Sequence, residues 1–570
     1  MNSEVAMLKR QRSVQSTMMQ VPLSVNHFLE RGRHLFGNRE IVSRLPDKSI
    51  ARTNYAALYD RARRLAAALV DAGVKPGEAV GTLMWNSIWH LEAYFGIPAA
   101  GAVLHTLNLR LSPNEIAYII KDAGNRIVLV DDVLLPLLEQ VLPLVELERV
   151  IVVPTSGAPV PPRYENYEEF IARDAADFRY PVLDENAPCG MCYTSGTTGR
   201  PKGVVHSHRA VVLHALSVSL PDCLNLSCQD SVFVVTPMFH VNAWGIPFAA
   251  AMVGCNLSFP GEHMGAEDLL DIMESEQVTQ ALGVPTIWMA IQQALDKQPN
   301  RWKLRPGTRM MVGGAAAAPS LIAGLERHGL SIKHGWGMTE LTPVGTLSWL
   351  KAEHATLPAE QQYEIRARQG LPIPLMELRV MGENGPQPWD GKSVGELQVH
   401  GPIVTGGYHN VPPDAEKLTE DGWFRTGDVA TIDAEGYMRI SDRTKDLIKS
   451  GGEWISSVAL ENAIMAHPKV AEAAVIAIKH PRWDERPLAV VVPCPDEELT
   501  DEELSAEDLR AFIAPHFAKW QLPDDFVFVD SLPRTSTGKF LKSALRERFK
   551  DWAFSERQAG REKGFRAQAV

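Results

Sequence analysis

The chain has 570 residues, of which 45% are hydrophobic and 22% are charged, and its formal net charge is −12. This composition is typical of a globular protein with several domains, and an acidic chain without a basic block excludes an ordinary nucleic-acid-binding protein. Six cysteines in a chain of this length exclude a disulfide scaffold.

The first 35 residues carry scattered charges and no continuous apolar segment, so they do not predict a secretory signal. Residues 231–261 carry no formal charge. Prolines and polar residues interrupt this stretch, whereas a membrane span needs about 20 mostly apolar residues. We therefore expect buried helices and strands that partly line a pocket, no integral membrane segment, and a cytoplasmic protein.

The first part of the chain alternates predicted helices and strands. Residues 55–74 have apolar residues at helical spacing, and residues 79–85, 126–132 and 147–154 are apolar runs of strand length. Residues 309–329 predict a strand, a glycine-rich turn and a helix. The turn places backbone N–H groups at a helix start, where a nucleotide binds favourably. The alternation favours a layered, parallel α/β architecture.

The pattern changes beyond about residue 370. Residues 376–401 contain short strand-like runs separated by Gly, Asn, Pro and Asp, which predict a β-rich subdomain. From residue 442 a helix, two strands and an acidic helical stretch at 497–513 predict a small α+β domain. We expect an α/β fold with a large N-terminal domain of several subdomains at 1–441, a hinge at 442–446, and a small mobile domain at 447–570.

The segment YTSGTTGRPKGVVHSH at 193–208 is rich in Gly and hydroxyl residues and contains Arg200 and Lys202. Glycine lets a backbone approach an anion closely, and lysine adds a point charge. The segment departs from the Walker pattern, because Lys202 follows a proline and neither Ser nor Thr comes after it. Taken alone, it leaves two alternatives open, a phosphate cradle and a flexible linker.

Cys189 and Cys192 form a CxxC pair directly before this segment. Such a pair can be a redox dithiol or half of a zinc site, although those sites need a helix start or paired zinc knuckles. The favoured interpretation is a short buried strand in which cysteine serves as a small apolar residue.

Five segments in chain order resemble the signatures of the adenylate-forming superfamily of acyl-CoA synthetases, luciferases and adenylation domains. They are YTSGTTGRPKG at 193–203, HGWGMTE at 334–340, GWFRTGD at 422–428, DRTKDLIKSGGEWIS at 442–456 and PRTSTGK at 533–539. The forms PMFHVNAW, SGGEWIS and FAKWQLP are most similar to bacterial medium- and long-chain fatty acyl-CoA ligases. They are also similar to methylmercaptopropionate-CoA ligases.

The resemblance implies a reaction in two steps. A carboxylate attacks the α-phosphate of ATP to give acyl-adenylate and pyrophosphate, and a thiol then displaces AMP. The implied partners are a small-molecule carboxylic acid, ATP and CoA, with Mg²⁺ as the cofactor, and the resembling enzymes are often homodimers. Because the first step brings two anions together, cations must screen the charge that develops there.

The resemblance also places a nucleotide site. Thr194 and Glu340 would hold Mg²⁺, which prefers oxygen ligands. Asp428 would bind the ribose hydroxyls with Arg443 beside it. Trp336 stands where the family usually has Tyr, so it can stack on adenine but lacks the hydroxyl. The other expected nucleotide-binding residues are Ser195, Gly196, Thr197, Thr198, Gly199 and Lys202 at the phosphates, Gly313, Gly314 and Ala315 at adenine, and His334, Gly335, Gly337, Met338 and Thr339 between them.

Two further lysines receive roles from the resemblance. Lys539 is the expected catalytic cation of adenylation, because a lysine on an exposed loop can contact the reacting groups in one domain orientation and leave in another. Lys445 matches the hinge position, where one residue absorbs a large φ/ψ change. Lys449, Glu453 and Trp454 would face the nucleotide or CoA.

His240 and Trp244 lie in the apolar stretch PMFHVNAWGIP, where the plain interpretation is two core-packed rings. In the resembling fatty acyl enzymes, this His lies near the acyl carboxylate as a catalytic residue and the Trp is a gate over an acyl tunnel. Val241 would line the same site. Small residues such as Ala243 and Gly245 beside large ones are consistent with a tunnel wall.

The favoured function is therefore an AMP-forming ligase that joins a medium- or long-chain fatty acid to CoA. Within this class, the alternatives are a short-chain or sulfur-containing acid, such as 3-methylmercaptopropionate, and transfer to a carrier-protein thiol. The alternative from another class is a non-catalytic nucleotide- or acyl-binding regulator. Intact Lys202, Glu340, Asp428, Arg443 and Lys539 argue against the regulator.

Overall fold

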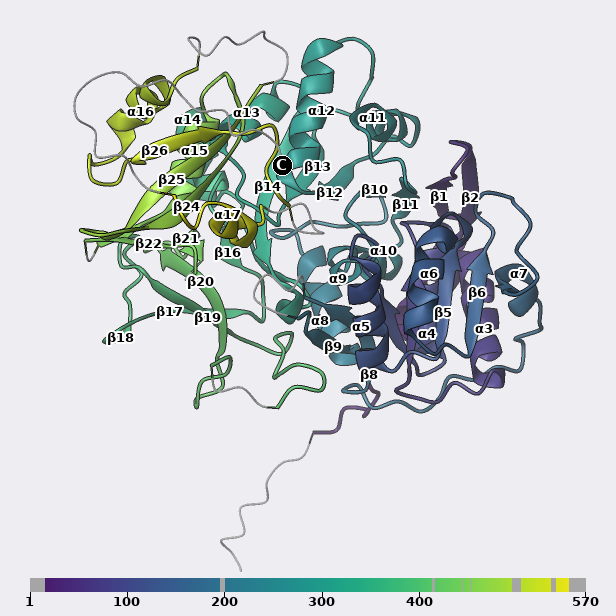
Figure 1. The fold of residues 1–570 in the computed structure, drawn as a ribbon. Helices are drawn as coiled ribbons and strands as arrows, with labels where there is room; N and C mark the ends of the chain where they lie inside the picture. The colour runs from purple at the N-terminus through teal and green to yellow at the C-terminus, as the bar shows by residue number, and fades with distance from the viewer. Residues whose placement is uncertain are drawn as a thin grey trace, which may run out of the picture.

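The structure is a computed structural model that describes residues 16–194, 200–412, 416–443, 445–451, 453–494, 504–534 and 540–552. Four sheets organise these residues, two of them large and mostly parallel and two of them smaller. Figure 1 shows β5 and β6 of one large sheet at the right in blue, and the C-terminal elements at the upper left in yellow-green. The predicted α/β fold, with a large N-terminal part and a smaller C-terminal part, is confirmed.

The seven-stranded sheet is parallel except for the pair formed by its last two strands. Its strands β3 and β5 are wholly buried, which explains why the sequence shows them as continuous apolar runs. In sheet order the strands are β7 (Glu165–Asn166), β6 (Arg149–Val153), β5 (Ile127–Asp131), β3 (Ala79–Leu83), β4 (Val103–Thr106), β8 (Pro188–Tyr193) and β9 (Gly203–Ser207). The three predicted early strands are confirmed as β3, β5 and β6.

The nine-stranded sheet contains a run of parallel strands from β1 to β14. In sheet order the strands are β16 (Leu371–Pro372), β15 (Val344–Leu347), β14 (Leu330–Gly337), β13 (Thr308–Val312), β12 (Gln280–Gly283), β10 (Ser231–Val234), β11 (Asn256–Phe259), β1 (Glu40–Arg44) and β2 (Ile50–Asn54). The predicted strand, glycine-rich turn and helix at 309–329 are confirmed as β13 and α13.

Helices α3, α4, α8 and α10 share one hydrophobic core with strands of both large sheets. The N-terminal helices are α2 (Asn26–Phe36), α3 (Tyr55–Asp71), α4 (Ile88–Ala99), α5 (Pro113–Ala123), α6 (Leu135–Val141), α7 (Tyr167–Phe170), α8 (His208–Ser219), α9 (Val241–Trp244), α10 (Ile246–Val253), α11 (Ala266–Ser275), α12 (Pro285–Lys297), α13 (Pro319–Glu326) and α14 (Ala359–Arg366). The uncharged stretch at 231–261 folds as β10, α9, α10 and β11. Within the described ranges, every helix is too short or too polar to cross a bilayer.

The predicted β-rich subdomain is a five-stranded antiparallel sheet. Its order is β18 (Gly385–Pro386), β17 (Glu377–Gly382), β19 (Gly395–His400), β20 (Phe424–Ile432) and β21 (Met438–Arg443). The last sheet contains β22 (Ile448–Ser450), β23 (Glu453–Ile455), β24 (Val470–His480), β25 (Asp484–Pro493) and β26 (Asp525–Phe528), with α15 (Ser457–Met465), α16 (Ala506–Ile513) and α17 (Lys542–Arg548). Of the predicted acidic helix at 497–513, the described part is α16.

The described core residues divide between Ile440 and Ile448. Two apolar clusters contain only residues from Ile448 onward, and the other clusters contain only residues up to Ile440. A domain with its own core is able to move as a unit. This division supports a boundary at 442–446, and the mobility of the small domain stays a prediction.

Candidate active site

The glycine-rich segment begins where β8 and β9 pair, with Tyr193 opposite Gly203. The Thr194 N–H donates to the Lys202 carbonyl at 3.0 Å, and the Lys202 N–H donates to the Thr194 hydroxyl at 3.2 Å. These bonds fix both residues at the base of the loop. Its tip, with the predicted phosphate-binding residues Ser195, Gly196, Thr197, Thr198 and Gly199, lies outside the described residues.

Glu340 lies in a single 3₁₀ turn and is 6% exposed. The Tyr408 hydroxyl donates to its Oε1 at 2.7 Å, and the Thr405 N–H donates to its carbonyl at 2.8 Å. Burial raises the pKa of the Glu340 carboxyl, and the hydrogen bond from Tyr408 opposes that rise. The Lys202 ammonium lies 5.0 Å from the centroid of the Tyr408 ring. The structure thus brings Lys202 and Glu340 to the same tyrosine.

No sequence motif singled out Tyr408. It lies in the GGYHN segment, and its contacts come from Lys202, directly before β9, and from the turn after β14. The only sequence signal is an aromatic residue after two glycines, a pattern that many surface turns share.

Asp428 lies on β20 opposite Arg443 on β21. Its Oδ1 is 3.4 Å from the Arg443 Nε, and its Oδ2 accepts a hydrogen bond from the Trp336 indole N–H at 2.9 Å. Asp428 is 6% exposed, so these donors hold a largely buried carboxylate in one orientation. Trp336 lacks the hydroxyl of the family's usual Tyr, and its indole N–H supplies a polar contact in this structure.

The predicted adenine segments lie at the ends of β13 and β14, where glycines permit close packing. A Cβ on Gly313 would lie 3.1 Å from the Trp244 ring and 3.3 Å from the Gly335 carbonyl oxygen. A Cβ on Gly337 would lie 2.2 Å from the Pro343 carbonyl oxygen, so no larger residue fits there. Gly314 has a φ of +84° and leads into the turn that contains Ala315.

Three more of the predicted nucleotide-binding residues make hydrogen bonds to neighbouring backbone groups. They are His334, Met338 and Thr339. His334 is buried, and its Nδ1 donates to the Ala367 carbonyl at 2.9 Å. Burial lowers its pKa, which favours the neutral ring. The Met338 N–H donates to the Pro343 carbonyl, and His206 donates to the Thr339 carbonyl.

The segment from Val241 to Gly245 is a left-handed turn, in which all five residues have φ between +47° and +73°. A left-handed conformation costs about 1–2 kcal/mol for each residue other than glycine. The buried Asn242 accepts a hydrogen bond from the Cys192 thiol at 2.7 Å, and the Trp244 ring packs at Gly313. Several observed outliers in succession favour a functional segment, because strain of this kind collects at binding sites.

The left-handed turn brings Trp244, one of the residues predicted to line the acyl site, next to Gly313 in the segment predicted to bind adenine. His240 directly precedes it and Val241 begins it, while the Trp244 ring, from within the turn, lies against Gly313. The His240 carbonyl accepts from the Ala243 N–H at 3.2 Å. The sequence predicted this group of residues, whereas the left-handed backbone of four residues other than glycine gave no sequence signal.

Cys189 and Cys192 both lie on β8 and are buried. Burial raises the pKa of both thiols, that of Cys192 to about 11. A thiol that stays protonated at neutral pH is a poor nucleophile and a poor metal ligand. The interpretation as a buried strand therefore agrees with the structure.

Of the C-terminal residues given roles by the resemblance, Lys449 and Trp454 lie opposite each other on β22 and β23, with Glu453 beside them. The Lys449 ammonium is 5.6 Å from the ring of Trp454, which is 53% exposed. The Lys445 carbonyl accepts from Arg546 on α17. Lys539 lies outside the described residues. A role for these residues toward nucleotide or CoA stays a prediction.

The donor set at Glu340 fits a divalent cation. Its buried carboxylate has no Lys or Arg nitrogen within 4.0 Å among the residues that the structure describes, and carboxylate and hydroxyl oxygens are donors that Mg²⁺ prefers. A Mg²⁺ site that Thr194 and Glu340 share stays a prediction.

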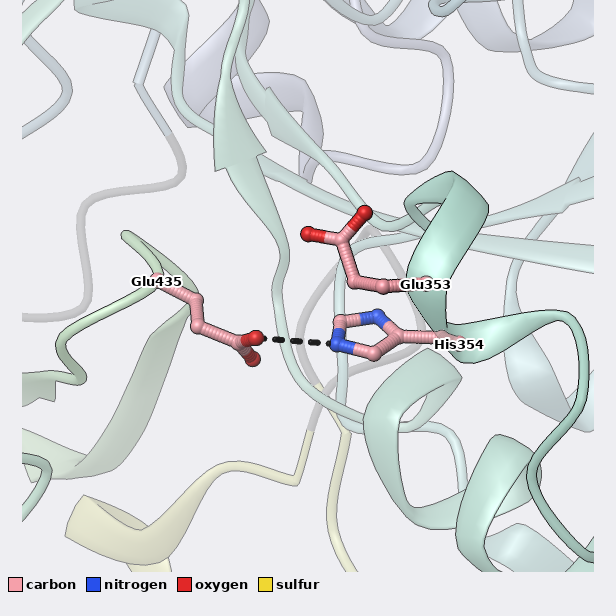
Figure 2. A group of neighbouring side chains, drawn as sticks. All are labelled: Glu353, His354 and Glu435. Atoms are coloured by element: carbon pink, nitrogen blue, oxygen red, sulfur yellow. Dashed lines mark hydrogen bonds and ion pairs between the residues drawn. The ribbon is translucent and has the colours of Figure 1, made fainter.

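A different group, Glu353, His354 and Glu435, is the only cluster of three possible ligands found in the described part of the chain. Figure 2 shows the Glu435 carboxylate pointing at the His354 ring. His354 Nε2 is 3.1 Å from that carboxylate, and Nδ1 is 3.3 Å from the Tyr437 hydroxyl. Since both ring nitrogens have partners, hydrogen bonds account for the position of the His354 ring without a metal.

Comparison with known proteins identifies the family of the chain. The profile of the AMP-binding enzyme matches residues 30–409, and the profile of the AMP-binding enzyme C-terminal domain matches residues 459–539. The chain belongs to the AMP-binding enzyme family. These ranges contain three of the five signature segments in full, and the other two, at 422–428 and 442–456, lie between the ranges.

Two relatives match nearly from end to end. A long-chain-fatty-acid–CoA ligase of Thermus thermophilus is 50% identical over 95% of this chain and 99% of its own length. A 3-methylmercaptopropionyl-CoA ligase of Ruegeria pomeroyi is 44% identical over 94% of this chain and 98% of its own. The fold is similar to that of an anthranilate CoA ligase in complex with anthranoyl-AMP, with a TM-score of 0.81, 24% identity, and coverage of 93% of this chain and 98% of that one.

Proposed function

We propose that this family member is an ATP-dependent acyl-CoA ligase that releases AMP and pyrophosphate. The observation that carries the proposal is the arrangement of Lys202 and Glu340 on Tyr408, together with Asp428 between Trp336 and Arg443. Lys202 would thus supply a cation and Glu340 a metal-binding carboxylate, and Asp428 beside the Trp336 ring would supply a carboxylate for the ribose. Attack of a carboxylate on the α-phosphate of ATP requires groups of these kinds, because they bind the nucleotide and stabilise the charge that develops.

In the first step, the chain's residues would bind ATP and screen its charge. Lys202 and the loop tip would contact the β- and γ-phosphates, Asp428 would accept hydrogen bonds from the ribose, and Trp336 would lie against adenine. Mg²⁺ held by Thr194 and Glu340 would neutralise phosphate charge. His240 would lie near the acyl carboxylate, and Lys539 would stabilise the charge that develops at the α-phosphate.

In the second step, a CoA thiol would displace AMP from the acyl-adenylate. The division of the core between Ile440 and Ile448 supports a small domain that turns about 442–446, with Lys445 as the hinge. Such a turn would withdraw Lys539 and bring Lys449, Glu453 and Trp454 toward the nucleotide or CoA.

The proposed acid is a medium- or long-chain fatty acid. Trp244, with Val241 beside it, would gate the acyl path, and the neighbouring small residues would line it. The relative from Thermus thermophilus supports this choice. The relative from Ruegeria pomeroyi supports a second candidate, 3-methylmercaptopropionate or another short-chain acid. Magnesium dependence, the homodimer and the cytoplasmic location expected from the sequence stay predictions.

A panel of acids from propionate and 3-methylmercaptopropionate to palmitate, with ATP, Mg²⁺ and CoA, tests the proposal. AMP and acyl-CoA formed best from C8–C16 acids would support fatty acid activation. A preference for the short acids would favour the second candidate. AMP without acyl-CoA would indicate another thiol acceptor. Nucleotide binding without AMP from any acid would favour the non-catalytic regulator.

A further inference from the structure

Residues 403–410, which we name the bridging loop, follow β19 and contact several parts of the candidate site. The Ile403 carbonyl accepts from the Thr342 hydroxyl at 2.8 Å, and the Thr405 N–H donates to the Glu340 carbonyl at 2.8 Å. At the other end, the His409 N–H donates to the Gly203 carbonyl at 2.8 Å. The loop is thereby fixed both to the turn that contains Glu340 and to the base of the phosphate loop.

The far end of the bridging loop is also held by α5. His409 Nε2 is 3.1 Å from the Asp122 carbonyl, and the Asn410 side-chain amide donates to the same oxygen at 2.9 Å. The Asp122 carboxylate accepts from the Tyr193 hydroxyl at 2.7 Å. Anchors on both sides of Tyr408 fix its backbone, so its side chain has a defined position before any ligand binds.

The Tyr408 side chain makes two different contacts with oppositely charged residues. Its hydroxyl donates to Glu340 Oε1 at 2.7 Å, and its ring lies 5.0 Å from the Lys202 ammonium, a distance typical of a cation–π contact. A third contact, with the Phe424 ring at a centroid distance of 6.5 Å, supports the ring from β20.

This arrangement matters because Lys202 and Glu340 carry opposite charges. An ammonium and a partly desolvated carboxylate form a direct ion pair when they come within contact distance. In the described part of the chain neither residue is in an ion pair, and each contacts Tyr408, the lysine at the ring and the glutamate at the hydroxyl. A direct pair would occupy the lysine needed at the phosphates and the carboxylate needed at the cation.

We propose that Tyr408 is a positioning residue for adenylation, which orients the Glu340 carboxylate through its hydroxyl and keeps Lys202 available through its ring. The inference rests on the proposed function, because it assigns Glu340 to the cation and Lys202 to the phosphates. The hydroxyl and the ring have separable effects, so two substitutions distinguish them. Tyr408→Phe removes only the hydroxyl, and Tyr408→Leu removes the ring as well.

The test measures Mn²⁺ binding in the presence of α,β-methylene-ATP, by electron paramagnetic resonance, and binding of the same nucleotide without metal, by calorimetry. For Tyr408→Phe we expect about tenfold weaker Mn²⁺ binding, since loss of a group that orients a ligand costs 10- to 100-fold. Metal-free nucleotide binding should stay within about twofold of wild type. Tyr408→Leu should weaken both, because Lys202 is then free to pair with Glu340.

Tyr180→Phe is the matched control, since the Tyr180 hydroxyl donates to Glu30 at 2.8 Å, away from the site. It should change neither measurement. Mn²⁺ binding by Tyr408→Phe equal to that of wild type would overturn the role of the hydroxyl. Metal-free nucleotide binding unchanged in Tyr408→Leu would overturn the role of the ring. Neither readout needs turnover, so failure of the proposed ligase activity is distinguishable from failure of this inference.

Discussion

The two sides of the candidate site are held in place by different forces. On the nucleotide side, which we define as Lys202, Trp336, Glu340, Tyr408 and Asp428, side chains are oriented by hydrogen bonds and ring contacts. On the acyl side, residues 241–245 are fixed by a left-handed backbone and by close packing of Trp244 on Gly313, and His240 directly precedes them.

This difference separates two kinds of effect. Substitutions on the nucleotide side should change nucleotide or metal binding and the rate of adenylation, and they should leave the preference among acids unchanged. Substitutions on the acyl side should change the preference among acids or the stability, with nucleotide binding retained. The four predictions below test this separation.

The largest effect is expected for Glu340→Gln on the nucleotide side. Loss of the charge should lower the rate of acyl-adenylate formation about 100- to 1000-fold, the range for removal of one electrostatic stabiliser of a transition state. Acid-dependent ATP–pyrophosphate exchange measures it. Glu353→Gln, in the separate cluster of Figure 2, is the control and should retain activity. A Glu340→Gln variant as active as this control would contradict a role of the Glu340 carboxylate in acyl-adenylate formation.

Trp244→Ala tests the acyl side. Removal of the ring that packs at Gly313 should shift the ratio of kcat/KM between a long and a short acid about tenfold, the scale of hydrophobic discrimination in a pocket. The ratio is measured within one variant, so a general loss of folded protein cancels. The KM for ATP should stay near the wild-type value. An unchanged ratio would contradict a gate at Trp244.

Trp336→Phe should raise the KM for ATP about tenfold, the lower end of the effect of one hydrogen bond to a charged group. The variant keeps an aromatic ring and loses the indole N–H that donates to Asp428, and a hydrogen bond to a charged group contributes about 1.5–3 kcal/mol. Steady-state kinetics with varied ATP gives the value. Trp336→Tyr restores a donor of the kind usual in the family and should recover part of the loss. A changed preference among acids in Trp336→Phe would contradict the prediction that substitutions on the nucleotide side leave this preference unchanged.

Gly245→Ala should have the smallest effect on the reaction and a clear effect on stability. Gly245 has a φ of +73°, and an added Cβ would lie 2.7 Å from His214 Nδ1. We expect a loss of about 1–3 kcal/mol in the free energy of unfolding, measured by denaturant titration. Gly73→Ala is the control, because Gly73 has a φ of +85° with nothing within 4 Å of the added Cβ. Equal losses in both variants would mean that packing at His214 contributes nothing.

The sequence predicted the parts of the site that depend on residue type. Thr194, Lys202, Glu340, Asp428 and Arg443 lie in recognisable segments, and strands such as β3 and β5 are continuous apolar runs. Each of these signals is local, so one chain suffices to find it. The predicted alternation of helices and strands likewise follows from local periodicity.

The sequence did not predict features that depend on contacts between distant segments. Tyr408 acquires its position from bonds of the bridging loop to Gly203 and Glu340, and no local pattern encodes them. The positive φ values of Val241 and Trp244 also contradict local propensity, which favours glycine or asparagine there. Packing against β8 and β13 imposes this backbone.

The most direct test of the central claim is the stoichiometry of products formed by the purified protein from ATP, Mg²⁺, CoA and one fatty acid, such as decanoate. Mass spectrometry and nucleotide chromatography would quantify AMP, pyrophosphate and acyl-CoA in the same reaction. The proposed ligase predicts equal amounts of all three, with no AMP when the acid is omitted. Release of ADP and phosphate, or AMP formation independent of the acid, would contradict it.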